Sequence, residues 1–199
     1  MLTKHYTPIS ETEYLRLEAQ SPVRHEYVSG EMFAMTGGTL RHNAIAINLT
    51  AALKSHLRNS GCHPYMNDVR VRVAKTSAYY YPDILVSCSK DGSSDDMRST
   101  TAEDPKLIVE VLSDSTASTD TREKLLAYRT LPSLAEYVLI SQDEARVEIH
   151  RRSGDIGWEK IEFTGAELVH LASVDLMISM RDIYDGVPIE SLERGPGER

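Results

Sequence analysis

Alternating hydrophobic and polar residues predict several β-strands in the middle of the chain. In residues 67–75, "NDVRVRVAK", the valines fall on one face and the arginines on the other, as in a strand with one exposed face. The stretches "YYYPDILVS" (79–87) and "PKLIVEVLS" (105–113) are more continuously apolar. They predict central strands that are buried on both faces.

A helical period appears in three other segments. Residues 41–58 repeat apolar side chains every three or four positions, and Gly61 follows as a stop signal. A shorter helix is expected over residues 10–20, which open on a capping-box pattern, S-x-x-E. A third helix is predicted over residues 120–130, with Asp120 as its N-terminal cap.

Shorter patterns complete the set of elements. Residues 25–38 alternate around a Ser-Gly pair and predict a hairpin, and residues 145–163 predict another with the turn "SGDIG". "EYVLI" (136–140) is one more buried strand, and residues 171–187 end in one or two helical turns. The order predicts an α/β protein, with a mixed sheet flanked by helices.

The length of 199 residues suits a single domain, expected over residues 1–190, with a flexible tail at 191–199. Residues 89–104 are expected to form a mobile loop. The net charge of −8 argues against a wholly basic, DNA-coating surface, although it allows a local basic patch.

Nothing in the sequence indicates a membrane or a secreted protein. No apolar run reaches membrane-spanning length, and the N-terminus lacks a signal-peptide core. Cys62 and Cys88 show no metal-ligand spacing. Their simplest interpretation is a reducing, cytoplasmic compartment.

Two of the apolar segments each carry one acid. Asp83 and Glu110 lie 27 positions apart, on strands that would be neighbours, and Lys124 follows on the next helix. Two converging carboxylates suit Mg²⁺ or Mn²⁺, and an ammonium beside them would hold the attacking water or offset developing charge. Together these residues suit metal-assisted hydrolysis of a phosphodiester.

Structural roles would explain the same residues. Asp83 follows a proline and would cap a turn, and Glu110 would pair with Arg70 or Arg72 across the sheet. Lys124 would then be a solvated helix residue. The spacing alone does not choose between these roles and a metal site.

The array "YPDILV", "PKLIVEVLSDST" and "DTREKLLAYRTLPSLAEYVLI" resembles the Uma2 family (DUF820), endonucleases of the PD-(D/E)XK superfamily. The resemblance runs from the N-terminal helix to about residue 185. It implies a restriction-endonuclease-like fold with an added N-terminal β-hairpin region. It also implies that Asp83 and Glu110 bind the metal and that Lys124 is catalytic with them.

This sequence departs from the family pattern at two positions. The superfamily lysine normally sits two residues after the second acid, where this chain has Leu112. The family implies that Lys124 reaches back to fill that role, which its long stem permits. Ser141 stands where related sequences often carry an acid, so that corner is not expected to be catalytic.

Other candidates are less specific. Glu31 resembles a glutamate that the family keeps near its hairpin and would complete the metal shell; Glu26 is a poorer version of the same case, and an exposed hairpin charge explains either. His42 would contact a phosphate or a catalytic water, or would only cap its helix. Six arginines and one tyrosine run would contact phosphates or bases, although solvation and packing explain them equally. They are Arg70, Arg72, Arg122, Arg129, Arg151, Arg152 and Tyr79–Tyr81.

The sequence therefore predicts a Mg²⁺- or Mn²⁺-dependent endonuclease that hydrolyses DNA. We expect a homodimer, because two-fold-related sites suit the cutting of two strands. The alternative is a module that keeps the nuclease fold and binds nucleic acid or protein without cleavage, since a fold does not determine a function.

Overall fold

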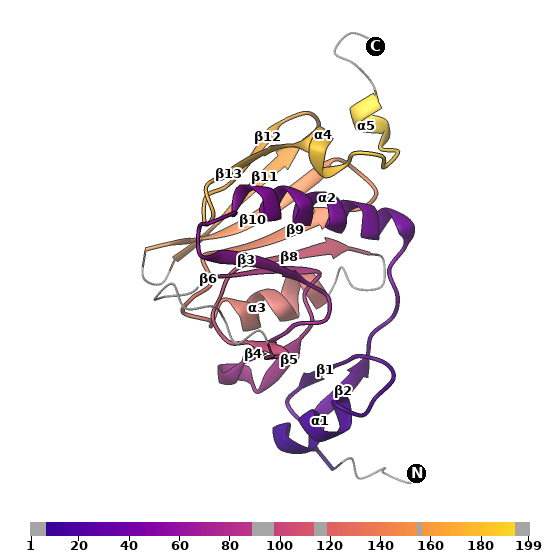
Figure 1. Cartoon of the computed structure of the whole chain (residues 1–199), viewed down its shortest axis with the longest axis vertical. Helices are drawn as coiled ribbons and strands as arrows, with labels where there is room; N and C mark the ends of the chain where they lie inside the picture. The colour runs from indigo at the N-terminus through magenta and orange to yellow at the C-terminus, as the bar shows by residue number, and fades with distance from the viewer. Residues whose placement is uncertain (1–6, 89–97, 114–118, 155–156, 194–199) are drawn as a thin grey trace.

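The computed structural model describes residues 7–88, 98–113, 119–154 and 157–193. Figure 1 shows a central sheet with the long helix α2 on one side and the short helix α3 on the other, while α1 and the β1–β2 hairpin extend toward the N-terminal end. The mixed α and β architecture expected from the sequence is confirmed. Among the described residues, no helix is long and apolar enough to span a membrane.

The central sheet has six strands in the order β11-β10-β9-β8-β6-β3. They are β3 (Cys62–Met66), β6 (Ile84–Cys88), β8 (Pro105–Leu112), β9 (Glu136–Ser141), β10 (Arg146–Ser153) and β11 (Gly157–Thr164). β8 and β9 run parallel, and the other strand pairs of this six-stranded sheet are antiparallel. The parallel pair requires a crossover, which carries the π-helical turn η2 (Thr119–Lys124) and α3 (Leu125–Tyr128).

A second sheet packs beside the first, in the order β2-β1-β5-β4-β7. Its strands are β1 (His25–Val28), β2 (Glu31–Ala34), β4 (Arg70–Val73), β5 (Ala78–Tyr80) and β7 (Thr101–Ala102). The remaining elements are α1 (Glu11–Glu18), α2 (Leu40–His56), η1 (Ala74–Thr76), β12 (Leu168–Leu171), β13 (Leu176–Ser179), α4 (Met180–Ile183) and α5 (Glu190–Glu193).

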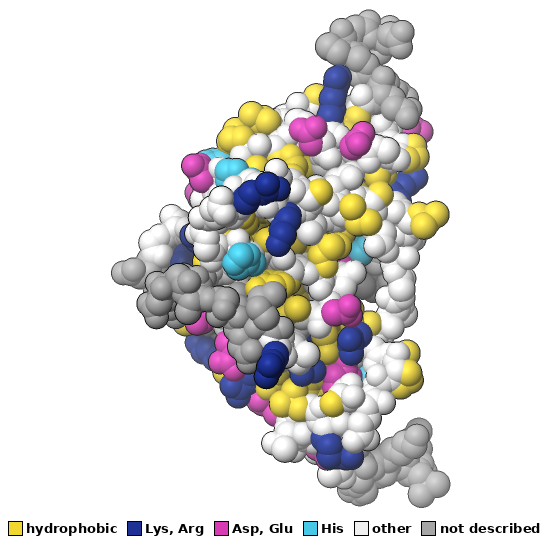
Figure 2. Space-filling model, in the orientation of Figure 1, with side chains coloured by type: hydrophobic (Ala, Val, Ile, Leu, Met, Phe, Trp, Pro, Cys, Tyr) yellow, Lys and Arg dark blue, Asp and Glu magenta, His cyan; other side chains and the backbone are white. Residues whose placement is uncertain are grey.

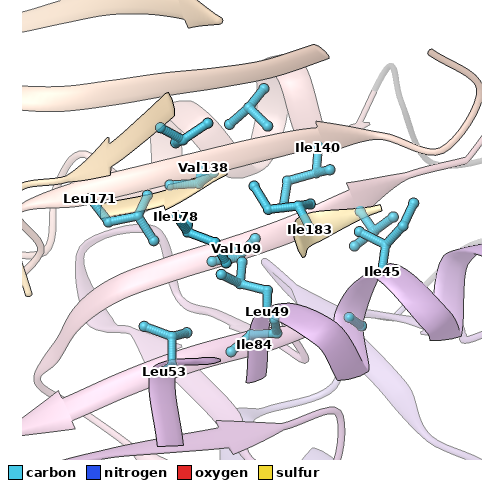
Figure 3. Packing of buried hydrophobic residues seen from close by; sticks show 14 of the residues in the cluster. Ile45, Leu49, Leu53, Ile84, Val109, Val138, Ile140, Leu171, Ile178 and Ile183 are labelled. Carbon is cyan, nitrogen blue, oxygen red and sulfur yellow. The ribbon is translucent and has the colours of Figure 1, made fainter. Parts of the chain in front are cut away.

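Strand parity divides the core into two layers. In β8, Leu107 and Val109 point toward α2, whereas Ile108 points toward α3 and the second sheet. Figure 3 shows α2 laying Ile45 and Leu49 onto the first of these faces. Because side chains alternate along a strand, a polar residue two positions after Ile108 must face the second layer.

The helix and hairpin predictions near the N-terminus are confirmed. The Ser10 side chain accepts a hydrogen bond from Glu13 N and caps α1, and Thr39 caps α2 through His42 N. The turn between β1 and β2 has positive φ at both Ser29 and Gly30. A Cβ on Gly30 would lie 2.4 Å from Pro8 Cβ, so only glycine fits there.

Several sequence expectations need correction. "YYYPDILVS" is not one strand: β5 ends at Tyr80, β6 begins at Ile84, and the two belong to different sheets. Pro82, which lacks an N–H for a ladder, lies in the link. β3 and the β12–β13 hairpin escaped prediction, because their apolar runs are short and irregular.

The expected mobile and flexible segments are described only in part. Within the loop predicted at 89–104, residues 89–97 lie outside the described residues, and Thr101–Ala102 forms β7 beside β4. α5 overlaps the start of the tail expected at 191–199, and residues 194–199 lie outside the described residues.

The interpretation of the two cysteines as reduced thiols is corrected by a disulfide. Cys62 and Cys88 are register partners on β3 and β6, with Cα atoms 4.0 Å apart, and they are bonded. Spacing along the sequence does not reveal strand register, which alone places the two thiols side by side. The five register pairs between β3 and β6 also join these strands without the covalent bond.

We expect reduction of this disulfide to lower stability without unfolding the protein. The bridge spans 26 positions, for which loop entropy predicts a loss of about 3.5 kcal/mol, or roughly 7–14 °C in Tm. Thermal unfolding with and without reductant measures the loss, and Cys62→Ser is the matched variant. Alkylation of two thiols in the unreduced protein, or an unchanged Tm, would contradict the assignment.

Candidate active site

The two predicted acids meet at the junction of the two sheets. Asp83 lies in the link between β5 and β6, and Glu110 lies on β8, on the face directed toward η2 and the second sheet. Asp83 N donates to Glu110 Oε2 at 3.3 Å, and Val111 N donates to Asp83 Oδ2 at 2.7 Å. The antiparallel register between β6 and β8 thus brings both carboxyl groups to one place, as expected.

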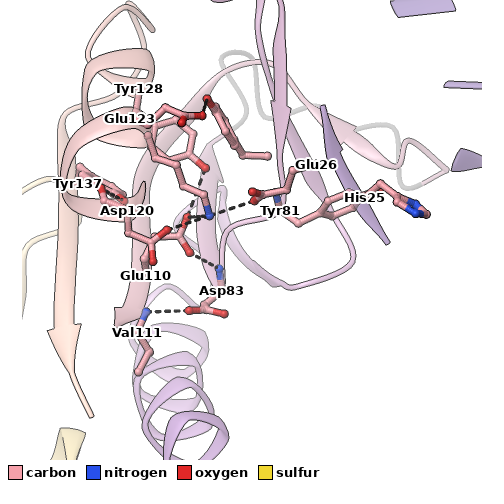
Figure 4. A network of polar contacts seen from close by, with 12 residues as sticks. His25, Glu26, Tyr81, Asp83, Glu110, Val111, Asp120, Glu123, Tyr128 and Tyr137 are labelled. Atoms are coloured by element: carbon pink, nitrogen blue, oxygen red, sulfur yellow. Dashed lines mark hydrogen bonds and ion pairs between the residues drawn. The ribbon is translucent and has the colours of Figure 1, made fainter. Parts of the chain in front are cut away.

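Lys124 reaches this place from the last residue of η2. Its Nζ lies 3.1 Å from Glu110 Oε1, 3.0 Å from Glu26 Oε1 and 3.1 Å from Asp120 Oδ1, and its side chain is 7% exposed. Figure 4 shows the three carboxyl groups pointing toward one another. A lysine from the turn after β8 thus lies beside Glu110, although Leu112 stands two residues after that acid.

The structure excludes two of the structural roles considered from the sequence, an arginine pair for Glu110 and a solvated position for Lys124. Glu110 does not pair with the arginines of β4: Arg70 donates to Thr101 Oγ1 and the Tyr81 hydroxyl, whereas Arg72 donates to Glu11. Lys124 is buried rather than solvated.

The carboxylates and the ammonium shift one another's pKa. Burial raises the pKa of Glu110 well above its usual range; the charge of Lys124 opposes the shift, and the neighbouring acids Asp120 and Asp83 reinforce it. Burial lowers the pKa of Lys124, but the charges of Glu110 and its neighbours outweigh burial and raise it. The site therefore favours an ammonium and holds an excess of carboxylates.

Tyrosine hydroxyls support the cluster from the second layer. The Tyr128 hydroxyl lies 3.5 Å from Glu110 Oε1, and the Tyr137 hydroxyl donates to the backbone oxygen of Asp120 at 3.0 Å. Burial raises the pKa of both tyrosines, so they remain neutral donors at neutral pH. The first contact joins α3 to β8, and the second joins β9 to η2.

His42 contacts the metal-ligand candidate rather than solvent. Its Nε2 lies 3.0 Å from Asp83 Oδ2. The hydrogen bond with Asp83 and that carboxylate's charge raise the pKa of His42, against the opposing effect of burial. A Cβ on Gly38 would lie 2.8 Å from His42 Nδ1, so this glycine makes room for the ring.

The acids nearest the hairpin differ from the sequence expectation. Glu31 is exposed at the start of β2, whereas Glu26 on β1 reaches Lys124. Asp120 was predicted to cap a helix, but it is buried in η2 and forms an ion pair with Lys124. The i, i+4 spacing of Asp120 and Lys124 was the signal for this pair; the π-helical turn, common at functional sites, places both inward.

A cavity of about 430 Å³ opens beside the cluster. Asp83, Glu110, Lys124 and His42 contribute to its walls, and Gly38 lies at its margin with the rest of the segment between β2 and α2. Among the described residues, no three His, Cys, Asp or Glu side chains converge as a complete metal shell. A cation held here would take its remaining ligands from water and substrate.

Most of the other candidates for nucleic-acid contact are engaged within the protein, whereas Arg122, in η2, is exposed. Tyr79, Tyr80 and Tyr81 are each at most 3% exposed. Arg129 and Arg152 stack on Trp158, and Arg151 pairs with Glu136. On the face shown in Figure 2, basic and acidic side chains are interspersed and form no continuous basic band. Ser141, at the end of β9, accepts hydrogen bonds from the backbone of the following turn.

Comparisons with known proteins point to one family. The Uma2 family model, described as "Putative restriction endonuclease", matches residues 12–181. Two uncharacterized proteins of Synechocystis sp. are similar: slr1290 is 30% identical over 92% of this chain and 94% of its own length. The other, sll1609, is 33% identical over 79% of this chain and 88% of its own length.

The fold is also found in a solved structure. A putative nuclease belonging to DUF820 from Anabaena variabilis superposes with a TM-score of 0.74 at 19% identity. The match covers 91% of this chain and 100% of that chain. At this identity the similarity shows that the two proteins share a fold.

Removal of the Lys124 ammonium is expected to destabilise the protein strongly. Lys124→Ala leaves buried carboxylates without their cation, which costs about 3–5 kcal/mol. The loss should be larger at pH 8 than at pH 5, because protonation relieves the unpaired acids. Urea unfolding at both pH values measures it, with Lys160→Ala as the control, since Lys160 is 53% exposed in its ion pair. Equal stability of both variants would contradict the buried network.

The fit between Gly38 and His42 can be tested with the neighbouring glycine. Gly38→Ala should push the ring away from Asp83 and lower the pKa of His42 toward its ordinary value of about 6.5. Gly37→Ala is the control, because a Cβ there meets nothing within 4 Å. NMR titration of the imidazole measures both, and the same pKa in both variants would refute the contact.

Proposed function

Because this chain belongs to the Uma2 family, we propose that it is a Mg²⁺- or Mn²⁺-dependent endonuclease that hydrolyses phosphodiester bonds of DNA. The observation that carries the proposal is the convergence of Asp83, Glu110 and Lys124 beside an open cavity. The fold shared with a DUF820 nuclease supports it.

The residues present fit a divalent cation. Three carboxyl groups, from Glu110, Glu26 and Asp120, lie around the single ammonium of Lys124, and Asp83 lies beside Glu110 in the same cavity. Asp120 Oδ1 is buried in ion-pair range of that ammonium without an aligned hydrogen bond. Added positive charge would relieve this excess, and Mg²⁺ typically takes one or two protein carboxylates, with water and phosphate oxygens completing its shell.

Asp83 and Glu110 would hold the cation, which when bound supplies a polarised phosphoryl oxygen and a more acidic water. His42 and Val111 N hold the Asp83 carboxylate in place. Lys124 positions its Nζ to offset negative charge that develops on the phosphoryl group. Its three ion pairs fix that nitrogen before substrate arrives.

Two further features accompany this proposal. A homodimer would present two sites to the two strands of DNA, and DNA would be met in the cytoplasm. The register pairs between β3 and β6 join these strands independently of the Cys62–Cys88 disulfide.

The proposal predicts that Asp83→Ala lowers Mg²⁺-dependent cleavage by at least about a hundredfold, because a cation contributes several kcal/mol to such reactions. Single-stranded, duplex and branched DNA should be compared, with and without EDTA. Asp143→Ala is the matched control, since Asp143 is 65% exposed in its pair with Arg41. Full activity of Asp83→Ala would reject the assignment, and inactivity of the native chain on every substrate would favour a non-catalytic binding module.

Metal binding gives a second measurement on the same site. Glu110→Gln retains the side-chain shape and removes the charge, so calorimetry should show weaker Mn²⁺ binding than in the native chain. Equal affinity in the two proteins would exclude Glu110 as a ligand.

A further inference from the structure

A second cavity, of about 340 Å³, lies on the other side of the same catalytic residues. Asp120 and Lys124 line both cavities, and Met35 and Thr36 form a shared wall between them. The second cavity extends along the β1–β2 hairpin, where its wall is largely apolar. Its volume is at the small end of ligand pockets, which suits one planar group.

Phe33 supplies the aromatic surface of this cavity. Register pairs Phe33 on β2 with Glu26 on β1, so both side chains occupy the same face of the hairpin. Glu26 reaches Lys124, and that face is therefore directed at the catalytic cluster. Phe33 is 49% exposed, whereas Tyr79, Tyr80 and Tyr81 are buried.

Polar groups line the same cavity opposite the apolar wall. Glu123 lines it and accepts one hydrogen bond, from the Tyr80 hydroxyl to Oε1. Thr36 adds a hydroxyl at the shared wall. An apolar surface with a few hydrogen-bonding groups at its edge matches a nucleobase, which has a π face and a polar rim.

We propose that this cavity binds an unstacked nucleobase next to the phosphodiester that is cut, with the base stacked on Phe33. The inference rests on the proposed function and specifies its substrate: a single strand, or a site where the duplex is locally unpaired. In an intact duplex both faces of each base are covered by its neighbours, so none could stack on Phe33.

The charge of the protein agrees with this substrate class. Duplex binding without stacking depends on many phosphate contacts, but the chain has a net charge of −8 and several of its arginines are engaged internally. Stacking gives affinity that needs no basic groove. A strand held by one stacked base and by the metal site would also place its phosphate at Lys124.

The decisive experiment combines a protein change with a substrate change. A single-stranded oligonucleotide is compared with versions that carry one abasic residue at successive positions around the cleavage site. For the native protein, loss of one particular base should lower kcat/KM by about 5- to 150-fold, the scale of one base–aromatic stack. For Phe33→Ala the same abasic residue should change kcat/KM little, because the stacking partner is already absent.

Three controls frame the comparison. Phe33→Trp should restore the dependence on that base, and circular dichroism should show that both variants fold. Leu168→Ala replaces a side chain that is 52% exposed on the separate β12–β13 hairpin and should behave like the native protein. A fully paired duplex of the same sequence should be cut more slowly than the single strand.

Binding is measured separately from cleavage. In a Glu110→Gln background, anisotropy of a fluorescein-labelled single-stranded 12-mer should report an affinity loss of about 5- to 150-fold on adding Phe33→Ala. Cleavage by the native chain with equal effects of the abasic residue in native and Phe33→Ala proteins would overturn this inference alone. Failure to cleave any substrate would overturn the proposed function, and this inference with it.

Discussion

The buried ammonium of Lys124 is the constraint on which the rest of this structure depends. A charge that is removed from water is tolerated only when opposite charges surround it. Here the partners come from three places: Glu110 on the central sheet, Glu26 on the second sheet and Asp120 on the crossover between β8 and β9. One side chain therefore joins the two sheets and the crossover at a single point.

The same constraint explains why stability and chemistry are combined at this point. Burial, reinforced by the neighbouring carboxylates, raises the pKa of Glu110, and burying these charges costs free energy that packing elsewhere must offset. The two apolar layers on either side of β8 provide that packing. Under the proposed function, a bound cation would relieve this excess of negative charge beside the cavity.

The β1–β2 hairpin contributes the wall of a second cavity beside the site. Glu26 and Phe33, from the hairpin of the second sheet, line one cavity beside the cluster, whereas Asp83 and His42 line the other. The segment between β2 and α2 then separates two cavities that share Lys124. A phosphate and the group next to it along a strand would find two different environments, one charged and one largely apolar.

The sequence by itself determined the local elements and the main acids. Helical period and caps predicted α1 and α2, strand alternation predicted β4, and the acids in apolar runs singled out Asp83 and Glu110. These signals are local: each depends on side chains within a few residues. The spacing of residues alone did not decide whether Lys124 is a solvated helix residue or part of the site, and the family resemblance favoured the site.

Only the tertiary structure decided which distant residues meet. Glu26, rather than Glu31, contacts Lys124. Asp120 forms an ion pair with Lys124 instead of capping a helix, and Cys62 is bonded to Cys88. The segment 79–87 is likewise divided near Pro82 into β5 and β6, which belong to different sheets. Strand register, sheet order and a π-helical turn depend on packing across the whole chain, and a one-residue change in register would reverse each strand's faces.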